Sequence, residues 1–217
     1  MDQPCPVDTK ALTELAKTDW TEFSGRLEDV RVASRGLGWL ERPMRPGTGT
    51  VAELRPVSQK AAHPNSLSAK VGFGEQPLHT DGAHMQCPPD VIVLASRAPT
   101  AAATRLWSAN EAGIPWDALR HGVFTVSTGQ TRFFSVIFEA GRLRFDPGCM
   151  TPCDQRAREA VAFFDSAWAG AERHQWRTGT EVLVINNRRA LHARESVGPL
   201  ELDRVIDRVA FWIPAER

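Results

Sequence analysis

The chain has 217 residues, which at about 150 residues per domain corresponds to one domain with additions, not to two full domains. Hydrophobic residues make up 42% and charged residues 24% of the sequence, and this composition excludes a disordered or collagen-like chain. Lysine plus arginine and aspartate plus glutamate number 26 each, so the formal net charge at pH 7 is zero. Without an excess of positive charge, we expect neither a nucleic-acid partner nor binding to an anionic membrane.

The sequence shows no targeting or membrane signal. Apolar stretches such as 91–95 and 182–185 are far shorter than the roughly 20 residues of a membrane helix. The first residues carry no basic segment followed by an apolar run. The four cysteines are too few and too irregularly spaced for a disulfide scaffold. We therefore expect a cytoplasmic protein.

The N-terminal part, residues 1–48, is predicted to form a helical cover. Asp8 is a suitable N-cap, and the apolar residues after it recur at helical spacing: Ala11, Leu12, Leu15, Ala16, Trp20, Phe23 and Leu27. Glycine and proline between 36 and 46 then predict a loop. We expect this segment to lie against a sheet.

The remainder, residues 49–217, is predicted to be mainly β. Strand candidates separated by turns cover 50–54, 68–72, 91–95, 104–107, 123–126, 132–138, 142–145, 182–185 and 208–213. The sequence from Phe138 to Arg142 predicts a hairpin turn. One helix is predicted near 152–168, with Thr151 as N-cap, Pro152 at the first helical position and Asp154 completing a capping box. Many short strands with few helices favour a sandwich or jelly roll.

Two segments carry residues suited to bind a metal ion. In His79-Thr80-Asp81, the imidazole and the carboxylate stand two residues apart, so on an extended segment they point to the same face. His192 follows the buried-strand pattern 182–185, and we expect it beyond the end of that strand as a third ligand. Two histidines and a carboxylate form the ligand set of non-haem Fe(II) oxygenases. By itself, a His-x-Asp pair is weak evidence, because such a pair more often has a solvated or hydrogen-bonded structural role.

Two arginines open the last predicted strand. Arg204 and Arg208 lie 12 and 16 residues after His192, and on an extended segment both guanidinium groups can point to one face. A guanidinium that faces a core is costly unless it meets an anion, and its planar fork matches a carboxylate. The alternative is that the two arginines pair at the surface with Asp203, Asp207 or Glu201.

Together these residues resemble a known family. They are similar to the motifs of the Fe(II)/2-oxoglutarate-dependent oxygenases of the TauD and clavaminate synthase-like group: His79-Thr80-Asp81, Asn186-Asn187-Arg188, His192, Arg194, Arg204 and Arg208. The resemblance extends from about Leu54 to Trp212, with Asn186-Asn187 where the family more often has Asp-Asn. It implies a double-stranded β-helix (jelly-roll) core with Fe(II) bound by His79, Asp81 and His192.

The resemblance also implies how the small molecules bind. 2-Oxoglutarate would chelate Fe(II) through its 1-carboxylate and 2-oxo group, with its far carboxylate on Arg204 and Thr104. Arg208 matches an arginine that contacts an acidic group of the substrate in some members. Ser68, some ten residues before His79, is a candidate hydrogen-bonding partner of a polar substrate. The expected cofactors are Fe(II), 2-oxoglutarate and O2.

The expected reaction is hydroxylation of a C–H bond in a small polar substrate, in particular an amino acid or an amino-acid-derived metabolite. Two alternatives stay open. A zinc-dependent hydrolase uses the same two-His-one-carboxylate site, but has no need of the arginine pair. A cupin-like binding protein would keep the barrel without turnover, but has no need of a complete ligand set. The four-residue arginine spacing and the zero net charge favour a small-molecule substrate over nucleic acid.

Overall fold

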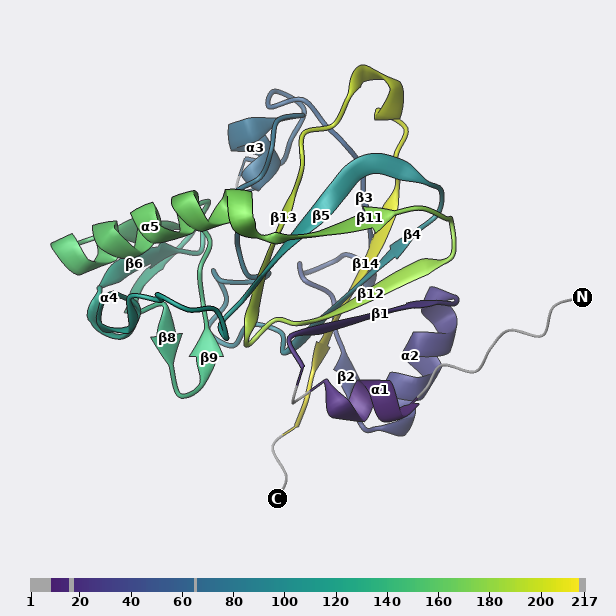
Figure 1. Ribbon diagram of the computed structural model, residues 1–217, viewed down its shortest axis with the longest axis horizontal. Helices are drawn as coiled ribbons and strands as arrows, with labels where there is room; N and C mark the ends of the chain where they lie inside the picture. Colours follow the sequence, from purple (N-terminus) through teal and green to yellow (C-terminus); the bar gives the residue numbers. More distant parts are fainter. Residues whose placement is uncertain (1–8, 16–17, 65, 215–217) are drawn as a thin grey trace, which may run out of the picture.

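Two facing antiparallel sheets form the centre of the computed structural model, which describes residues 9–15, 18–64 and 66–214 (Figure 1). The large sheet contains, in spatial order, β1 (Trp20–Ser24), β12 (Glu181–Asn186), β4 (Val91–Ser96), β14 (Ile206–Trp212) and β2 (Leu40–Glu41), with β3 (Val51–Leu54) also paired to β14. The small sheet contains β11 (Glu172–Trp176), β5 (Thr100–Ser108) and β13 (Ala190–Arg194). This arrangement confirms the mainly β, jelly-roll fold.

The large sheet is apolar on both faces because both faces are covered. In β4, Ile92 points into the core between the two sheets, whereas Val93 packs on the opposite face. In β14, Ile206 and Ala210 belong to the same inner core. Because side chains alternate along a strand, Arg208 faces the interior with them.

Two helices, α1 (Thr9–Glu14) and α2 (Leu27–Gly36), cover the outer face of the large sheet (Figure 1). Leu12 and Val30 are buried there against Val93. The prediction of a purely helical cover over residues 1–48 is wrong, because β1 and β2 also fall in this part and belong to the large sheet. Asp8 and Ala16 lie outside the described residues.

Trp20 and Phe23 show why helical spacing misled at the N-terminus. They lie in β1, where residues three apart point to opposite faces of the sheet. Trp20 packs against the core between the sheets, and Phe23 packs against the outer cluster under the helices. Because each face needs an apolar residue, the strand imitates helical periodicity.

The outer face of the small sheet is covered by α4 (Trp116–His121) and α5 (Gln155–Ala167). Trp107 of β5 and Leu191 of β13 are buried with Phe164 of α5 in this cluster. A second three-stranded sheet contains β10 (Met150–Pro152), β6 (Phe124–Ser127) and β7 (Arg132–Ser135). A separate hairpin consists of β8 (Phe138–Glu139) and β9 (Arg142–Leu143). The expected strand 132–138 is thus divided between β7 and β8, and β9 is shorter than expected.

The hairpin and the later helix are confirmed, the helix with a different start. Ala140 and Gly141 connect β8 to β9 with φ values of 49° and 76°, as a two-residue turn of type I′ requires. Thr151 and Pro152 lie in β10, not in the helix. Asp154 is the N-cap of α5, and its carboxylate accepts a hydrogen bond of 2.7 Å from the Ala157 N–H.

The strand expected over 68–72 is instead a short helix, α3 (Leu67–Val71). A short run of this kind does not by itself distinguish a strand from a helical turn. Gly72, with φ of 55°, ends the helix in a conformation that favours glycine. Two 3₁₀ turns complete the structure, η1 (Trp168–Gly170) and η2 (Pro199–Glu201). No helix within the described ranges combines the length and apolarity that a bilayer crossing requires.

Candidate active site

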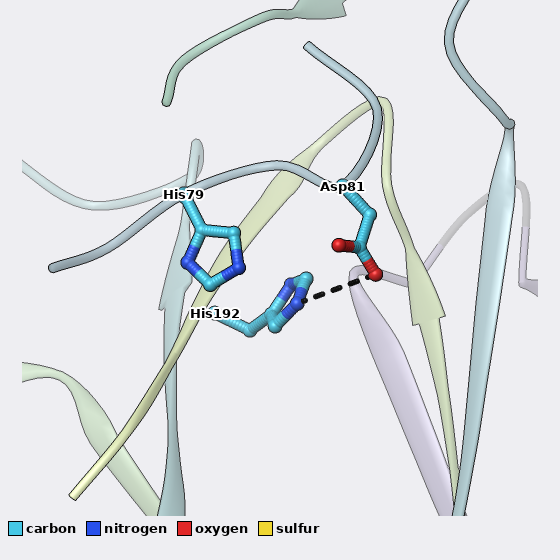
Figure 2. Close-up of side chains that lie close together, drawn as sticks. All are labelled: His79, Asp81 and His192. Atoms are coloured by element: carbon cyan, nitrogen blue, oxygen red, sulfur yellow. Dashed lines mark ion pairs between the residues drawn. The ribbon is translucent and has the colours of Figure 1, made fainter. Parts of the chain in front are cut away.

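Three side chains suited to bind a metal ion converge from distant parts of the chain (Figure 2). One ligand atom from each of His79, Asp81 and His192 lies within 4.8 Å of the others, and all three residues are buried. The backbones of the two histidines exchange two hydrogen bonds, each of 2.9 Å, so the segment that carries His79 extends the small sheet beyond β13. His192 lies beyond the end of β12, as expected, and it belongs to a further strand, β13, that was not among the predicted strands.

The protonation states of these groups suit a cation. The Nδ1 of His79 lies 3.0 Å from the Pro77 carbonyl, and an N–H donated there leaves Nε2 with its lone pair free. Burial, followed by the nearby His79, lowers the pKa of His192 to about 3, so this imidazole is neutral at pH 7. Burial alone would raise the pKa of Asp81, but Arg208 and then the histidines outweigh it, and the pKa lies below its usual value. Asp81 is therefore ionised.

The donor set fits a metal ion. Asp81 Oδ2 is buried without a hydrogen-bond partner among the described residues, and it lies 3.8 Å from His192 Nε2. An ionised oxygen buried in this way is costly unless a cation satisfies it. Two imidazole nitrogens and one carboxylate oxygen suit Fe(II) as well as Zn²⁺.

A cavity of about 270 Å³ adjoins the three groups. It is lined by every residue that the sequence suggested for metal, cosubstrate or substrate: His79, Asp81, His192, Thr104, Arg204, Arg208 and Ser68. Ser68 lies on α3, while Arg208 on β14 donates from Nη1 to Asp81 Oδ1 at 2.9 Å. The structure thus brings all seven residues to one cavity.

Arg204 lies just before β14, in register with the inward-facing positions of that strand. Its Nε is buried and has no hydrogen-bond partner in the described part of the chain. Burial, followed by the neighbouring Arg194, lowers its pKa to about 10, against the attraction of Glu201. A guanidinium held this way suits an anion, because a carboxylate would satisfy its donors and offset its desolvation.

The sequence left open that Arg204 and Arg208 pair with acidic residues at the surface. Asp207 and Glu201, two of the three candidates, have other partners. The Asp207 carboxylate pairs with Arg97 at 2.6 Å on the other face of β14. The Glu201 carboxylate accepts a hydrogen bond of 2.6 Å from the Thr100 hydroxyl. Among the described residues, neither carboxylate forms an ion pair with Arg204 or Arg208, although Glu201 is near enough to attract Arg204.

Two cavity features were not assigned from the sequence. Trp176 donates its Nε1–H to the Thr104 hydroxyl at 3.1 Å, so the hydroxyl keeps its own hydrogen for another acceptor. Arg194 lines the cavity and donates from Nη2 to the carbonyls of Gly72 and Gly74, at 2.8 and 2.6 Å. Arg194 stands two residues after His192, so strand alternation could have placed it at the site, whereas nothing in the local sequence marks Trp176 as the partner of Thr104.

The fold recurs among solved structures of iron oxygenases. An asparagine oxygenase in complex with Fe(II), 2S,3S-3-hydroxyasparagine and succinate matches with a TM-score of 0.73 and 16% identity, over 93% of this chain and 78% of that one. The non-heme iron oxygenase OrfP in complex with Fe, succinate and (3S)-hydroxy-L-Arg matches with a TM-score of 0.71 and 16% identity, over 96% and 79%. PvcB of Pseudomonas aeruginosa, an Fe, alpha-ketoglutarate dependent oxygenase, matches with a TM-score of 0.64 and 19% identity, over 94% and 80%.

No protein-family model matches the sequence, and no curated protein matches it. The likeness is therefore one of three-dimensional structure, and it covers nearly the whole chain. The chain has the jelly-roll fold of these non-haem iron oxygenases.

Proposed function

We propose that the protein is an Fe(II)/2-oxoglutarate-dependent oxygenase that hydroxylates a C–H bond of a small amino-acid-like substrate. The observation that carries this proposal is the juxtaposition of His79, Asp81 and His192 with the unsatisfied guanidinium of Arg204 in one cavity. A metal site alone serves many reactions, whereas a metal site beside a buried anion site suits a cosubstrate with a carboxylate at its far end.

In this proposal His79, Asp81 and His192 would hold Fe(II), and the adjoining cavity would take 2-oxoglutarate and the substrate. When bound, Fe(II) with O2 and 2-oxoglutarate supplies the oxidising power for hydroxylation, while 2-oxoglutarate is converted to succinate and CO2. The chain contributes preorganisation. The Pro77 carbonyl fixes the tautomer of His79, and Arg208 keeps Asp81 ionised and oriented.

Arg204 and Thr104 are assigned to the far carboxylate of 2-oxoglutarate. Arg204 offers a guanidinium with an unmatched buried N–H, and Thr104 offers a hydroxyl hydrogen, because its oxygen already accepts from Trp176. Thr104 lies in β5 of the small sheet and Arg204 lies just before β14 of the large sheet, so a carboxylate between them would bridge the two sides of the cavity.

Arg208 and Ser68 are assigned to the substrate. Arg208 donates from Nη1 to Asp81 and also lines the cavity. Its remaining N–H groups suit an acidic group of the substrate. The asparagine oxygenase and OrfP structures contain hydroxylated amino acids, which supports an amino-acid substrate here. A substrate of this size, together with the zero net charge of the chain, favours a small molecule over nucleic acid.

The alternatives are weaker on the same observations. A zinc hydrolase that activates water gives no account of the buried Arg204, and a binding protein without turnover gives none of the complete ligand set. The spectrum of the anaerobic protein with Fe(II) separates these possibilities. We expect a visible charge-transfer band on addition of 2-oxoglutarate, and a silent spectrum with the metal confirmed present would favour the hydrolase or binding protein.

Substitutions then test the cosubstrate assignment. Arg204→Lys should raise the 2-oxoglutarate requirement much more than Arg208→Lys, because an ammonium cannot reproduce a bidentate contact with a carboxylate. The reverse order would transfer the role to Arg208.

A panel of amino acids and small organic acids tests the substrate class. We expect at least one amino acid or related acid to stimulate succinate formation above the uncoupled background. Stimulation only by a carrier-bound or uncharged molecule would contradict the assignment.

A further inference from the structure

Two consecutive asparagines, Asn186 and Asn187, lie where β12 turns toward β13. They are 6% and 1% exposed, so both amides must find partners inside the protein. Asn186 donates from Nδ2 to the carbonyls of Leu15 and Thr18, at 2.9 and 3.3 Å, and so fastens the N-terminal segment. The two side chains are chemically identical but fasten different segments of the chain.

Asn187 fastens the segment that carries the metal-binding carboxylate. Its Oδ1 accepts from the Asp81 N–H at 2.9 Å, and its Nδ2 donates to the Asp81 carbonyl at 3.0 Å. The same Nδ2 donates to the Pro89 carbonyl at 2.9 Å, while the Asn187 N–H donates to the Asp90 carbonyl at 3.0 Å. Both ends of the loop 81–90 are therefore held by one residue.

This attachment matters because Asp81 pairs with no strand in the part of the chain that the structure describes. The two histidines hold each other through backbone hydrogen bonds, whereas the backbone of Asp81 is held by a side chain from another segment. The chain turns sharply directly after Asp81. Gly82 has φ of 72°, and a Cβ there would lie 2.7 Å from the Pro89 ring. The direction of the Asp81 side chain therefore depends on how this closed loop is oriented, in addition to the contact of the carboxylate with Arg208.

We propose that Asn187 is a positioning residue that sets the orientation of Asp81 toward the metal ion. The inference rests on the proposed metal site and adds to it a residue that touches neither metal nor substrate. Partners that orient a metal ligand affect affinity although they donate nothing to the ion, typically by about 10- to 100-fold.

The test compares Asn187→Ala with Asn186→Ala by titration of the metal-free protein with Co(II), followed by visible absorption. We expect Asn187→Ala to weaken Co(II) binding by about 10- to 100-fold. We expect Asn186→Ala to stay within about twofold of wild type, because its amide bonds the N-terminal segment and the Arg188 N–H, and neither of these contacts involves Asp81. Thermal midpoints are measured alongside, and we expect both variants to lose stability, so that only the affinity separates the two roles.

Wild-type affinity in Asn187→Ala, or an equal loss in Asn186→Ala, would overturn the inference while leaving the metal site intact. Failure of the wild-type protein to bind Co(II) would remove the metal site and the inference together. If Asn187→Ala does not fold, Asn187→Ser, which keeps a single hydroxyl, enters the same titration. A folded serine variant with unchanged affinity would equally overturn it.

Discussion

Arg204 illustrates at the scale of one residue how a binding group lowers stability. Its guanidinium is largely buried beside Arg194 without a hydrogen-bonded anion. We expect Arg204→Met to raise the Tm of the protein without 2-oxoglutarate by about 2–4 °C, corresponding to roughly 1 kcal/mol. The same variant should lose the stabilisation that 2-oxoglutarate with Co(II) gives to the wild type, about 2.7 kcal/mol at a hundredfold excess over Kd.

Differential scanning fluorimetry measures both effects. Arg208→Met provides the contrast, because Arg208 already pairs with Asp81 and its removal leaves that carboxylate buried without its partner. A fall in Tm for both variants would show that Arg204 stabilises the empty protein.

Trp176 permits a second test at the residue scale. Trp176→Phe removes the N–H that orients the Thr104 hydroxyl, and we expect the KM for 2-oxoglutarate to rise about three- to tenfold with kcat little changed. Trp107→Phe is the matched control. Trp107 is also fully buried, but it lies on the opposite face of β5 from the cavity, and its Nε1 has no partner among the described residues. An equal effect of both substitutions on KM would assign the change to general loosening of the fold.

At the scale of an element, the start of α5 gives a pH-dependent prediction. The N–H groups of Ala157 and Val123 lower the pKa of the Asp154 carboxyl. A carboxyl with a lowered pKa in the folded state stabilises the protein above its unfolded pKa, and loses this contribution as the pH falls through the folded pKa. We therefore expect Asp154→Ala to lower the Tm at pH 7, with a deficit that narrows below about pH 4.

Thr151→Ala is the control for this helix. The sequence predicts Thr151 as N-cap, but Thr151 lies in β10. Its replacement should therefore leave the Tm of the protein close to that of the wild type. A larger effect of Thr151→Ala than of Asp154→Ala would contradict the observed cap.

The strands show what the sequence could predict. β4 and β12 are buried on both faces, and their continuous apolar runs are visible without any structure. β13 was not predicted because two of its inward positions are His192 and Arg194, which line the cavity and break the apolar pattern. β11 was not predicted because Trp176 is its only apolar residue, while His174 is buried with Glu22 as its partner. A strand whose buried positions are polar lacks the pattern that would identify it.

At the scale of the whole molecule, the residues of the candidate site could be predicted better than the contacts that hold them in place. Spacing of two and four residues placed His79 with Asp81, and Arg204 with Arg208, on common faces, and these side chains do line one cavity. The supporting contacts, such as that of Asn187 with Asp81, join residues 106 positions apart. No local pattern encodes such a contact, because it exists only after the sheets have formed.

The charge balance of the whole molecule gives a further prediction. With a formal net charge of zero at pH 7, the molecules repel each other least near neutrality. We expect solubility, measured at low ionic strength as the protein concentration left after precipitation with polyethylene glycol, to be higher at pH 8.5 than at pH 7. Equal solubility at both values would show that surface patches, and not net charge, control association.

Because the backbones of His79 and His192 pair directly, the two histidines form a fixed part of the site, and the Asp81 carboxylate forms a part that can be exchanged. The histidines keep their register without help from Asp81, whose carboxylate is supplied by a loop. A shortened side chain at this position would leave the histidine pair in place, beside the guanidinium of Arg208 and a space for a small anion. Formate should then restore Co(II) binding to Asp81→Gly while leaving wild-type binding unchanged. Such chemical rescue would make the carboxylate a replaceable component, through which ligands foreign to the protein could be introduced.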